Sequence, residues 1–160
     1  MVHQKILTYT ILIVCFKSTY VYSGLSEKEY LEIWNLEVTR NAFEKCMEKF
    51  DVSSSEGEKM YTDPDYEFDP LFLDCFFTEC GIMDKGIFNV EKSMSLSKLY
   101  VQREDELARL YNIRQECSKV NEAKVIDGEA GYGERARLLY DCLKEKEDDF
   151  VLVEEQYRKS

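Results

Sequence analysis

Residues 71–89 read LFLDCFFTECGIMDKGIFN, an aromatic run that contains two cysteines. Its first half is apolar on nearly every side of a helix, and it follows Pro70, a residue type favoured at the first position of a helix. A helix of this kind is either buried all round, or buried on one side while it lines a cavity on the other. Gly81 is expected to end the helix, and residues 83–86 are expected to form a turn. We therefore expect the other helices of the chain to pack around this segment.

The region before this stretch predicts one long helix and one long connection. Ser26 and Glu29 have the spacing of a capping box, which marks the start of a helix. Apolar residues then recur at helical spacing without Gly or Pro, which predicts a helix from about residue 26 to about residue 50, with a break near Arg40 left open. A serine-rich segment and two prolines follow, and they predict a connection that holds one short helix.

Three further helices are predicted after residue 89. Asn89 is expected to cap a helix that carries Met94, Leu96 and Leu99. The next predicted helix runs from about residue 103 to about residue 122, and Asp127 is expected to cap the last one. The apolar faces of these two helices are expected at Leu107, Leu110, Tyr111, Arg114 and Cys117, and at Leu138, Leu139, Cys142 and Leu143. No alternation of apolar and polar residues is strong enough to predict a sheet.

The N-terminus has the composition of a secretory signal peptide. Lys5 precedes a short apolar core, small residues follow at Ser23 and Gly24, and cleavage after Ser23 would leave residues 24–160 as a single domain. The apolar core is too short to cross a bilayer, which takes about 20 residues. We therefore expect residues 1–23 to be a signal peptide and the mature protein to be secreted, extracellular and not inserted in a membrane.

The balance of charges and the position of the single histidine argue against several function classes. The formal net charge is −11, so neither nucleic acid nor an anionic membrane surface is an expected partner. The only histidine, His3, lies in the predicted signal peptide, so the mature chain has no imidazole for a Ser/His/Asp triad, a Cys/His pair or an HExxH zinc site. We expect no enzymatic activity, no metal site and no cofactor.

The cysteines predict two disulfides and one free thiol. Removal of Cys15 with the signal peptide leaves an odd number of cysteines in a secreted protein. Those that remain are Cys46, Cys75, Cys80, Cys117 and Cys142. Their spacing alone leaves the pairing open.

One pattern in the opening stretch resembles a known family. Cys75 is followed, after five residues, by Gly81-Ile-Met-Asp and then, after three more, by Phe88-Asn89. Together with the order of the predicted helices and the secretion signal, this pattern resembles the insect odorant-binding proteins of the pheromone-binding and general odorant-binding protein (PBP/GOBP) family. The resemblance covers nearly all of residues 24–160. It implies an all-α fold, a compact bundle of about six helices around an apolar cavity, cross-linked by two disulfides.

The resemblance also implies which cysteines pair. The family has six cysteines, and those matching its first, third, fourth and sixth are Cys46, Cys75, Cys117 and Cys142. The second and fifth, which pair with each other in the family, fall on Leu71 and Gly133. The chain is therefore similar to the minus-C subgroup, which has two disulfides. The implied bridges are Cys46–Cys75 and Cys117–Cys142, with Leu71 facing Gly133 where the other bridge is missing.

Cys80 is a departure from the family pattern. Taking Cys80 in place of Cys75 as the third cysteine also gives an acceptable distance to Cys117, and it would pair Cys80 with Cys46. The register with Cys75 is preferred because it sets the Gly-Ile-Met-Asp turn at the family's distance. We expect Cys80 to be a free thiol, or to join a second copy of the chain in a homodimer.

The function that the resemblance implies is the carriage of small hydrophobic or amphipathic molecules in an extracellular fluid. The expected ligand-binding residues are apolar side chains around the cavity, two hydroxyls that orient the ligand, and a C-terminal segment that closes the cavity. They are Leu73, Phe76, Phe77, Met83, Phe88, Met94, Leu110 and Leu139; Thr78 and Tyr111; and Phe150, Val151 and Val153. The helical residues among them are also ordinary core residues, so the resemblance, and not composition, favours a binding role.

Two alternatives are left open. Within the family, odorant transport competes with the scavenging of host mediators in saliva, since blood-feeding flies have salivary relatives of this kind. Outside it, an acidic extracellular interaction protein without a ligand cavity would have the same composition. Binding of an apolar fluorescent probe would separate carriage from interaction, and contact with a receptor is not predicted either way.

Overall fold

The computed structural model describes residues 37–63 and 66–146. In these ranges the chain forms six α-helices, one short 3-10 helix and one two-stranded hairpin, so the prediction of an all-α bundle of about six helices is confirmed. The elements are α3 (Glu37–Lys49), α4 (Ser54–Thr62), α5 (Pro70–Glu79), β1 (Met83–Asp84), β2 (Ile87–Phe88), α6 (Val90–Ser97), α7 (Glu104–Cys117), η1 (Ser118–Glu122) and α8 (Glu129–Lys146). The predicted signal peptide, the capping box at Ser26 and the segment from Phe150 to Val153 lie outside the described residues.

Helix α5 begins and ends where its sequence predicts. The carboxylate of Asp69 accepts from the main-chain N–H groups of Leu71 and Phe72 at 2.8 and 3.2 Å, and Pro70 occupies the first turn, where no N–H is needed. After the helix, Gly81 has a φ of +75°, a conformation that glycine adopts without the strain of a Cβ. Both boundaries are therefore set by local chemistry.

The turn predicted at residues 83–86 is present, and it joins two short paired strands that were not predicted. Met83 pairs with Phe88 and Asp84 with Ile87 in antiparallel register. Lys85 and Gly86 both have positive φ, as a two-residue hairpin of type I′ requires. Strands of two residues are too short to carry an alternating pattern, so the sequence held no signal for them. The side chain of Asn121 then donates to the carbonyl of Phe88 at 2.9 Å and accepts from its N–H at 2.8 Å, which fixes the hairpin to η1.

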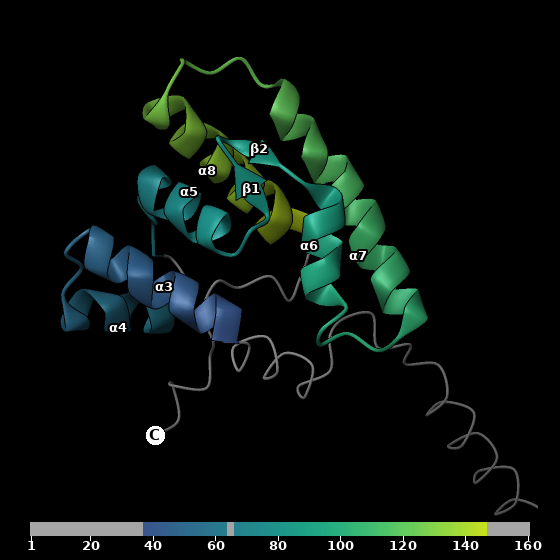
Figure 1. Cartoon of the computed structure of the whole chain (residues 1–160), viewed down its shortest axis with the longest axis horizontal. Coiled ribbons are helices and arrows are strands. Elements are labelled where there is room, and N and C mark those ends of the chain that lie inside the picture. The colour runs from purple at the N-terminus through teal and green to yellow at the C-terminus, as the bar shows by residue number, and fades with distance from the viewer. Residues whose placement is uncertain (1–36, 64–65, 147–160) are drawn as a thin grey trace, which may run out of the picture.

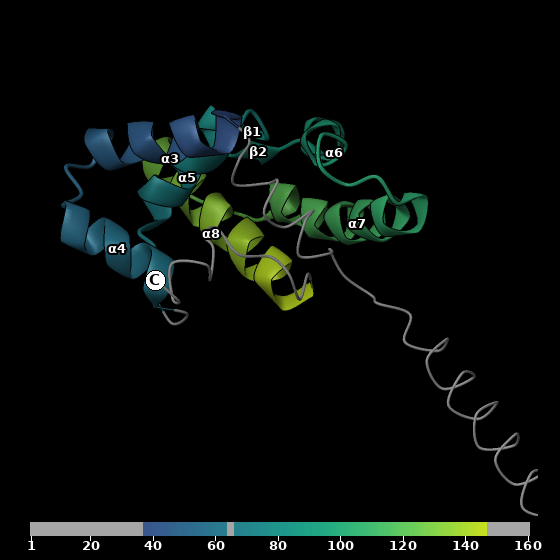
Figure 2. The same cartoon turned by 90° about the horizontal axis from the view of Figure 1, so that it is seen from below.

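The helices form two ends joined by a centre (Figures 1 and 2). In both views α3 and α4 lie at one end, α6 and α7 at the other, and α5 and α8 between them. Helix α5 contacts α3 and, most extensively, α8, as expected of the segment that organises the fold. The helices at the other end differ from the prediction, because α6 packs on α7, and α7 packs on α8.

The largest group of buried apolar side chains, the main cluster, lies between α3, α5, α8 and the hairpin. It comprises Ala42, Phe43, Cys46, Met60, Phe68, Phe72, Leu73, Cys75, Phe76, Phe77, Ile82, Met83, Phe88, Cys117, Ala136, Leu139, Tyr140 and Leu143. Phe72 is at its centre, with its ring 5.5 Å from that of Phe43 and 6.1 Å from that of Phe68. A smaller group, the α6–α7 cluster, comprises Met94, Tyr100, Val101 and Leu110.

Two disulfides cross-link the helices as predicted. Cys46–Cys75 joins α3 to α5, and Cys117–Cys142 joins α7 to α8. Cys80 is a free thiol, so the alternative register that pairs it with Cys46 is wrong.

Leu71 and Gly133 face each other, as the register of the cysteines predicts. A Cβ added to Gly133 would lie 3.1 Å from Cδ2 of Leu71 and 3.2 Å from its main-chain nitrogen. Because α5 and α8 approach closely at this point, a larger side chain at position 133 would require its neighbours to shift by a few tenths of an ångström.

Some details of the predicted helices are wrong. Helix α3 continues through Arg40 without a break. Helix α8 begins at Glu129 and not directly after Asp127, because Gly128 stands between them with a φ of +89°. Leu138 and Leu99 were both expected on apolar faces, yet Leu138 is exposed on α8 and Leu99 lies beyond the end of α6.

Within the part of the chain that the structure describes, no helix has the combination of length and apolarity that crossing a bilayer requires.

Candidate functional site

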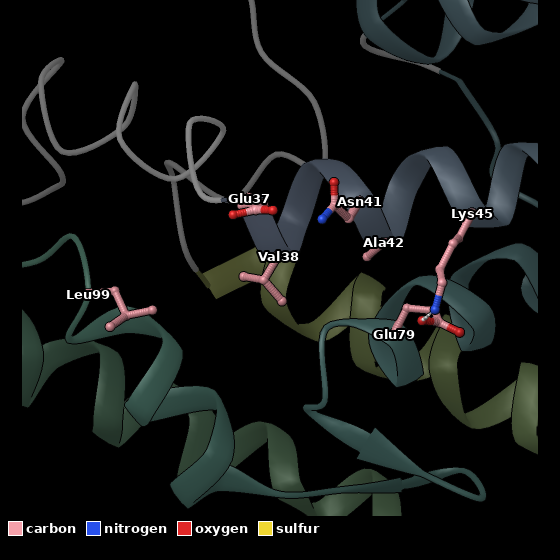
Figure 3. Close-up of a pocket in the computed structure, with 7 residues that line it drawn as sticks. All are labelled: Glu37, Val38, Asn41, Ala42, Lys45, Glu79 and Leu99. Atoms are coloured by element: carbon pink, nitrogen blue, oxygen red, sulfur yellow. Dashed lines mark hydrogen bonds and ion pairs between the residues drawn. The ribbon is translucent and has the colours of Figure 1, made fainter.

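A pocket of about 590 Å³ lies between α3, the end of α5 and the connection from α6 to α7 (Figure 3). The described residues that line it are Glu37, Val38, Asn41, Ala42, Lys45, Glu79 and Leu99. Its volume falls within the range of about 300 to 1,000 Å³ that is typical of small-molecule sites. The pocket therefore has the size of a ligand site and a lining of mixed polarity.

Helix α3 supplies most of the wall through its helical repeat. Glu37, Asn41 and Lys45 recur every four residues, as do Val38 and Ala42, so the two sets form adjacent rows on one face of the helix. Ala42 is buried, whereas the polar row is exposed. The pocket is therefore apolar at its base and polar along its rim.

An ion pair borders the pocket on the side of α5. The ammonium group of Lys45 lies 2.7 Å from a carboxylate oxygen of Glu79, the last residue of α5, so the pair links α3 to α5 through two residues that are 34 positions apart in the sequence. The side chains of Lys45 and Glu79 are 65% and 36% exposed. An exposed pair of this kind stabilises a fold by less than about 1 kcal/mol, so its main effect here is to neutralise the charge of Lys45.

The opposite wall is Leu99, whose side chain faces that of Val38 across the pocket (Figure 3). Leu99 is 64% exposed, which leaves apolar surface available to a ligand. The next two residues, Tyr100 and Val101, are buried in the α6–α7 cluster. The connection is therefore anchored in a core directly beside its exposed leucine.

A buried polar group fixes this connection to α7. The guanidinium of Arg114 donates to the carbonyl of Ser93 at 3.1 Å and to the hydroxyl of Ser97. The hydroxyl of Ser97 in turn donates to the carbonyl of Ser93 at 3.2 Å and lies 3.3 Å from the hydroxyl of Tyr100. Arg114 is only 6% exposed, and a buried cation is stable only when such hydrogen bonds satisfy it. This Arg114 group, Arg114 with Ser93, Ser97 and Tyr100, holds the Leu99 wall of the pocket in place.

The apolar residues predicted to bind a ligand are divided between the two clusters. The main cluster contains Leu73, Phe76, Phe77, Met83, Phe88 and Leu139, and the α6–α7 cluster contains Met94 and Leu110. The described lining of the pocket includes none of these residues. The three predicted residues of the tail, Phe150, Val151 and Val153, lie outside the described residues.

The two hydroxyls predicted to orient a ligand face outward. Thr78 is exposed on α5. Tyr111 is 40% exposed, and its hydroxyl accepts from the side-chain amide of Gln115 at 2.8 Å, so the prediction that it lies on the inner stripe of its helix is wrong. Leu110, Arg114 and Cys117 form the buried stripe of α7, and Tyr111 lies about 100° further round the helix.

Sequence reasoning missed the polar rim of the pocket and the role of Arg114. A signal for the rim exists in the repeat of Glu37, Asn41 and Lys45 beside Val38 and Ala42, which marks an amphipathic face. A signal for Arg114 exists in its position between Leu110 and Cys117 on an apolar stripe, since a charged residue there must be satisfied internally.

Cys80 follows Glu79 and has little reactivity as a thiol. Burial, and to a smaller extent the nearby carboxylate of Glu79, raises the pKa of Cys80 to about 12. Since the thiolate is the species that attacks a disulfide, this high pKa disfavours bridging of Cys80 to a second copy at neutral pH.

Comparison with known proteins gives one match. The family model described as "PBP/GOBP family" matches residues 34–146, a range that contains all the described helices and both disulfides. No curated protein and no solved structure matches the chain.

Proposed function

Because this chain belongs to the PBP/GOBP family, a family of small-molecule binding proteins, we propose that it carries small hydrophobic or amphipathic molecules in an extracellular fluid. The observation that supports this role is the pocket of about 590 Å³ with Val38, Ala42 and Leu99 in its wall. We propose this pocket as the ligand site. In this proposal, the apolar residues that the sequence predicted as ligand contacts are core residues that pack behind the walls of the pocket.

The expected affinity is moderate. A ligand that buries about 200 Å² of apolar surface gains roughly 5 kcal/mol at about 25 cal/mol per Å². The loss of translational and rotational freedom opposes this gain, by an amount that varies with the preorganisation of the site. The disulfide from α3 to α5 and the Arg114 group hold the two walls in place before the ligand arrives, which reduces that opposing term.

The extracellular location rests on three observations. The N-terminal 23 residues have the pattern of a signal peptide, the family is one of secreted proteins, and two disulfides form in oxidising compartments. Whether the fluid is olfactory or salivary is decided by the tissue in which the protein is expressed. Detection of the protein by immunostaining in sensory organs or in salivary glands separates the two.

A displacement assay tests the carrier role. The apolar fluorescent probe N-phenyl-1-naphthylamine is titrated into the folded protein and then displaced with decan-1-ol. The variant Leu99→Gln should weaken probe binding about three- to tenfold, because it replaces apolar pocket surface with an amide. The matched control is Leu138→Gln, since Leu138 is also exposed but lies on α8, outside the described lining.

The result would count against the proposal in either of two cases. Failure of the folded protein to bind the probe would favour the second function, an acidic interaction protein without a ligand cavity, which the net charge of −11 alone suggests. Equal weakening by Leu99→Gln and Leu138→Gln would show that the probe binds elsewhere.

A further inference from the structure

We propose that the pocket prefers amphiphiles whose polar head is a protonated amine, with the carboxylate of Glu37 as the group that attracts it. This inference rests on the proposed carrier function and deepens it. It assigns a class of ligand to the pocket and a role to Glu37 in selecting it.

The charges in the pocket leave one carboxylate available. Lys45 and Glu79 are paired at 2.7 Å and together carry no net charge. Glu37 has no hydrogen bond or ion pair among the described residues. The described lining therefore has a net charge of −1, and that charge lies at Glu37.

The position of Glu37 relative to the apolar wall suits an amphiphile. Glu37 precedes Val38 on α3, and the side chain of Val38 faces Leu99 (Figure 3). Asn41 is one turn further along the same row, where its amide oxygen can accept a second hydrogen bond from an ammonium group. A head group at Glu37 would thus place its hydrocarbon chain between Val38 and Leu99, with Ala42 at the base.

One feature of α3 opposes the attraction and is too weak to reverse it. The first turn of a helix carries roughly +0.5 of an elementary charge, and Glu37 is in the first turn of α3. A full carboxylate charge exceeds this partial charge. The field of the whole chain acts in the same direction as Glu37, since a net charge of −11 concentrates cations and repels anions near the surface.

The expected preference is modest because Glu37 is exposed. An exposed ion pair changes affinity by about two- to fivefold and weakens with salt. We therefore expect decylammonium to bind about two- to fivefold more tightly than decan-1-ol at low salt, and decanoate to bind more weakly than the alcohol. All three are used below their micelle concentrations and at pH 7, where an alkylamine with a pKa near that of lysine, about 10.4, is protonated.

The test compares these three ligands by probe displacement in three proteins: the parent, Glu37→Gln and Glu44→Gln. Glu44 is an exposed glutamate on the same helix outside the described lining, so Glu44→Gln makes the same change in net charge. Glu37→Gln should abolish the preference for decylammonium over decan-1-ol, whereas Glu44→Gln should keep it. Raising NaCl from 20 to 500 mM should reduce the preference in the parent.

The outcomes separate this inference from the proposed function. If probe and decan-1-ol bind but decylammonium gains nothing over the alcohol, or if Glu37→Gln keeps the preference, the inference is overturned and the carrier function stands. If neither probe nor alcohol binds the folded protein, both are overturned. Circular dichroism of each variant confirms that its fold is retained.

Discussion

The main cluster and the α6–α7 cluster lie behind opposite walls of the pocket and are held together in different ways. The main cluster is large and aromatic, and a disulfide inside it joins α3 to α5. The α6–α7 cluster has four buried apolar residues, and the buried Arg114 group provides its directional contacts. The burial of apolar surface stabilises the main cluster, whereas hydrogen bonds position the residues of the α6–α7 cluster.

Because of this difference, one wall of the pocket is part of the stable core and the other is a short connection open to solvent. The α3 wall is continuous with the core, so Ala42 is buried and Val38 is half-buried. The Leu99 wall is a short connection anchored from behind by Tyr100 and Val101. We therefore expect changes in the main cluster to alter global stability, and changes in the α6–α7 cluster to alter local order and ligand binding.

The largest expected effect is that of Phe72→Ala in the main cluster. Truncating this buried ring removes contacts with Phe43 and Phe68 and should lower the free energy of unfolding by about 3 to 5 kcal/mol in urea titrations. The neighbouring Leu71→Ala is the control, because Leu71 is exposed and should lose less than about 1.5 kcal/mol. Similar losses for the two variants would mean that the main cluster does not dominate stability.

Removing either disulfide should have the next largest effect. The bridges span 29 and 25 residues, so the paired changes Cys46→Ser/Cys75→Ser and Cys117→Ser/Cys142→Ser should each cost about 3.5 kcal/mol in the chain-entropy model. Hydrogen exchange should distinguish the two variants. Loss of Cys117–Cys142 should expose the amides of α6 and α7 first, because α7 is then held to α8 by packing and by the partly exposed ion pair of Glu116 and Lys146. Uniform loss of protection along the chain would contradict the division into two regions.

Restoring a bridge at Leu71 and Gly133 should strengthen the main region. The variant Leu71→Cys/Gly133→Cys, made with Cys80→Ser to prevent mispairing, should raise the free energy of unfolding by about 2 to 4 kcal/mol at most. A Cβ at position 133 would lie 3.1 Å from the main-chain carbon of Pro70, so some of this gain is offset by crowding. The serine pair at both positions is the control. No bond under oxidising conditions would show that the two side chains cannot meet.

A smaller effect is expected from Arg114→Met in the other region. The methionine keeps the apolar stem but removes the guanidinium hydrogen bonds to the hydroxyl of Ser97 and the carbonyl of Ser93, a cost of about 1 to 3 kcal/mol. The change should also weaken probe binding, because Leu99 loses its anchor. Arg40→Met, on the exposed face of α3, is the control. Probe affinity unchanged in Arg114→Met would show that the Leu99 wall does not depend on this group.

The smallest effect concerns pH and Asp74 in α5. Burial raises the pKa of Asp74 above its ordinary value of 3.8; the charge of Lys49 opposes this rise, and the charge of Glu129 adds to it to a smaller extent. Because the folded protein binds this proton more tightly, stability falls as pH rises from 3.8 through the raised pKa. Asp74→Asn should therefore stabilise the protein at pH 7 by less than about 1 kcal/mol, since the half-buried carboxyl is partly solvated.

The sign of this effect can be checked by melting temperature. The advantage of Asp74→Asn over the parent should shrink as pH is lowered toward 3.8. Asp84→Asn, at an exposed position of the hairpin, provides the comparison. A stabilisation that grows toward acid pH would contradict the raised pKa of Asp74.

The parts of the fold that depend on local chemistry could be predicted. Asp69, Pro70 and Gly81 fix the ends of α5, and Asn89 caps α6 by accepting from Lys92 at 2.9 Å, as expected. The two disulfides followed from the register of the cysteines in the family, which also placed Leu71 against Gly133.

The parts of the fold that depend on contacts between residues far apart in the sequence could not be predicted. Lys45 and Glu79 meet across 34 residues, and Leu99 comes against α3 from a connection whose path no local pattern specifies. Tyr111 shows a second reason why prediction failed. It is next to the buried Leu110 on α7, and the apolar pattern of that helix is too broad to tell which of the two residues faces solvent. The pocket therefore had to be found in the folded structure.

A crystal structure with 10-bromodecan-1-ol bound would show where the ligand lies, because the anomalous signal of bromine locates it without assumptions about its contacts. If the pocket between α3 and the α6–α7 connection is the ligand site, the bromine peak should lie in contact with Val38, Ala42 or Leu99. A peak enclosed by Phe76, Phe77 and Leu139 inside the main cluster would contradict the assignment and would place the ligand in a cavity opened within the core.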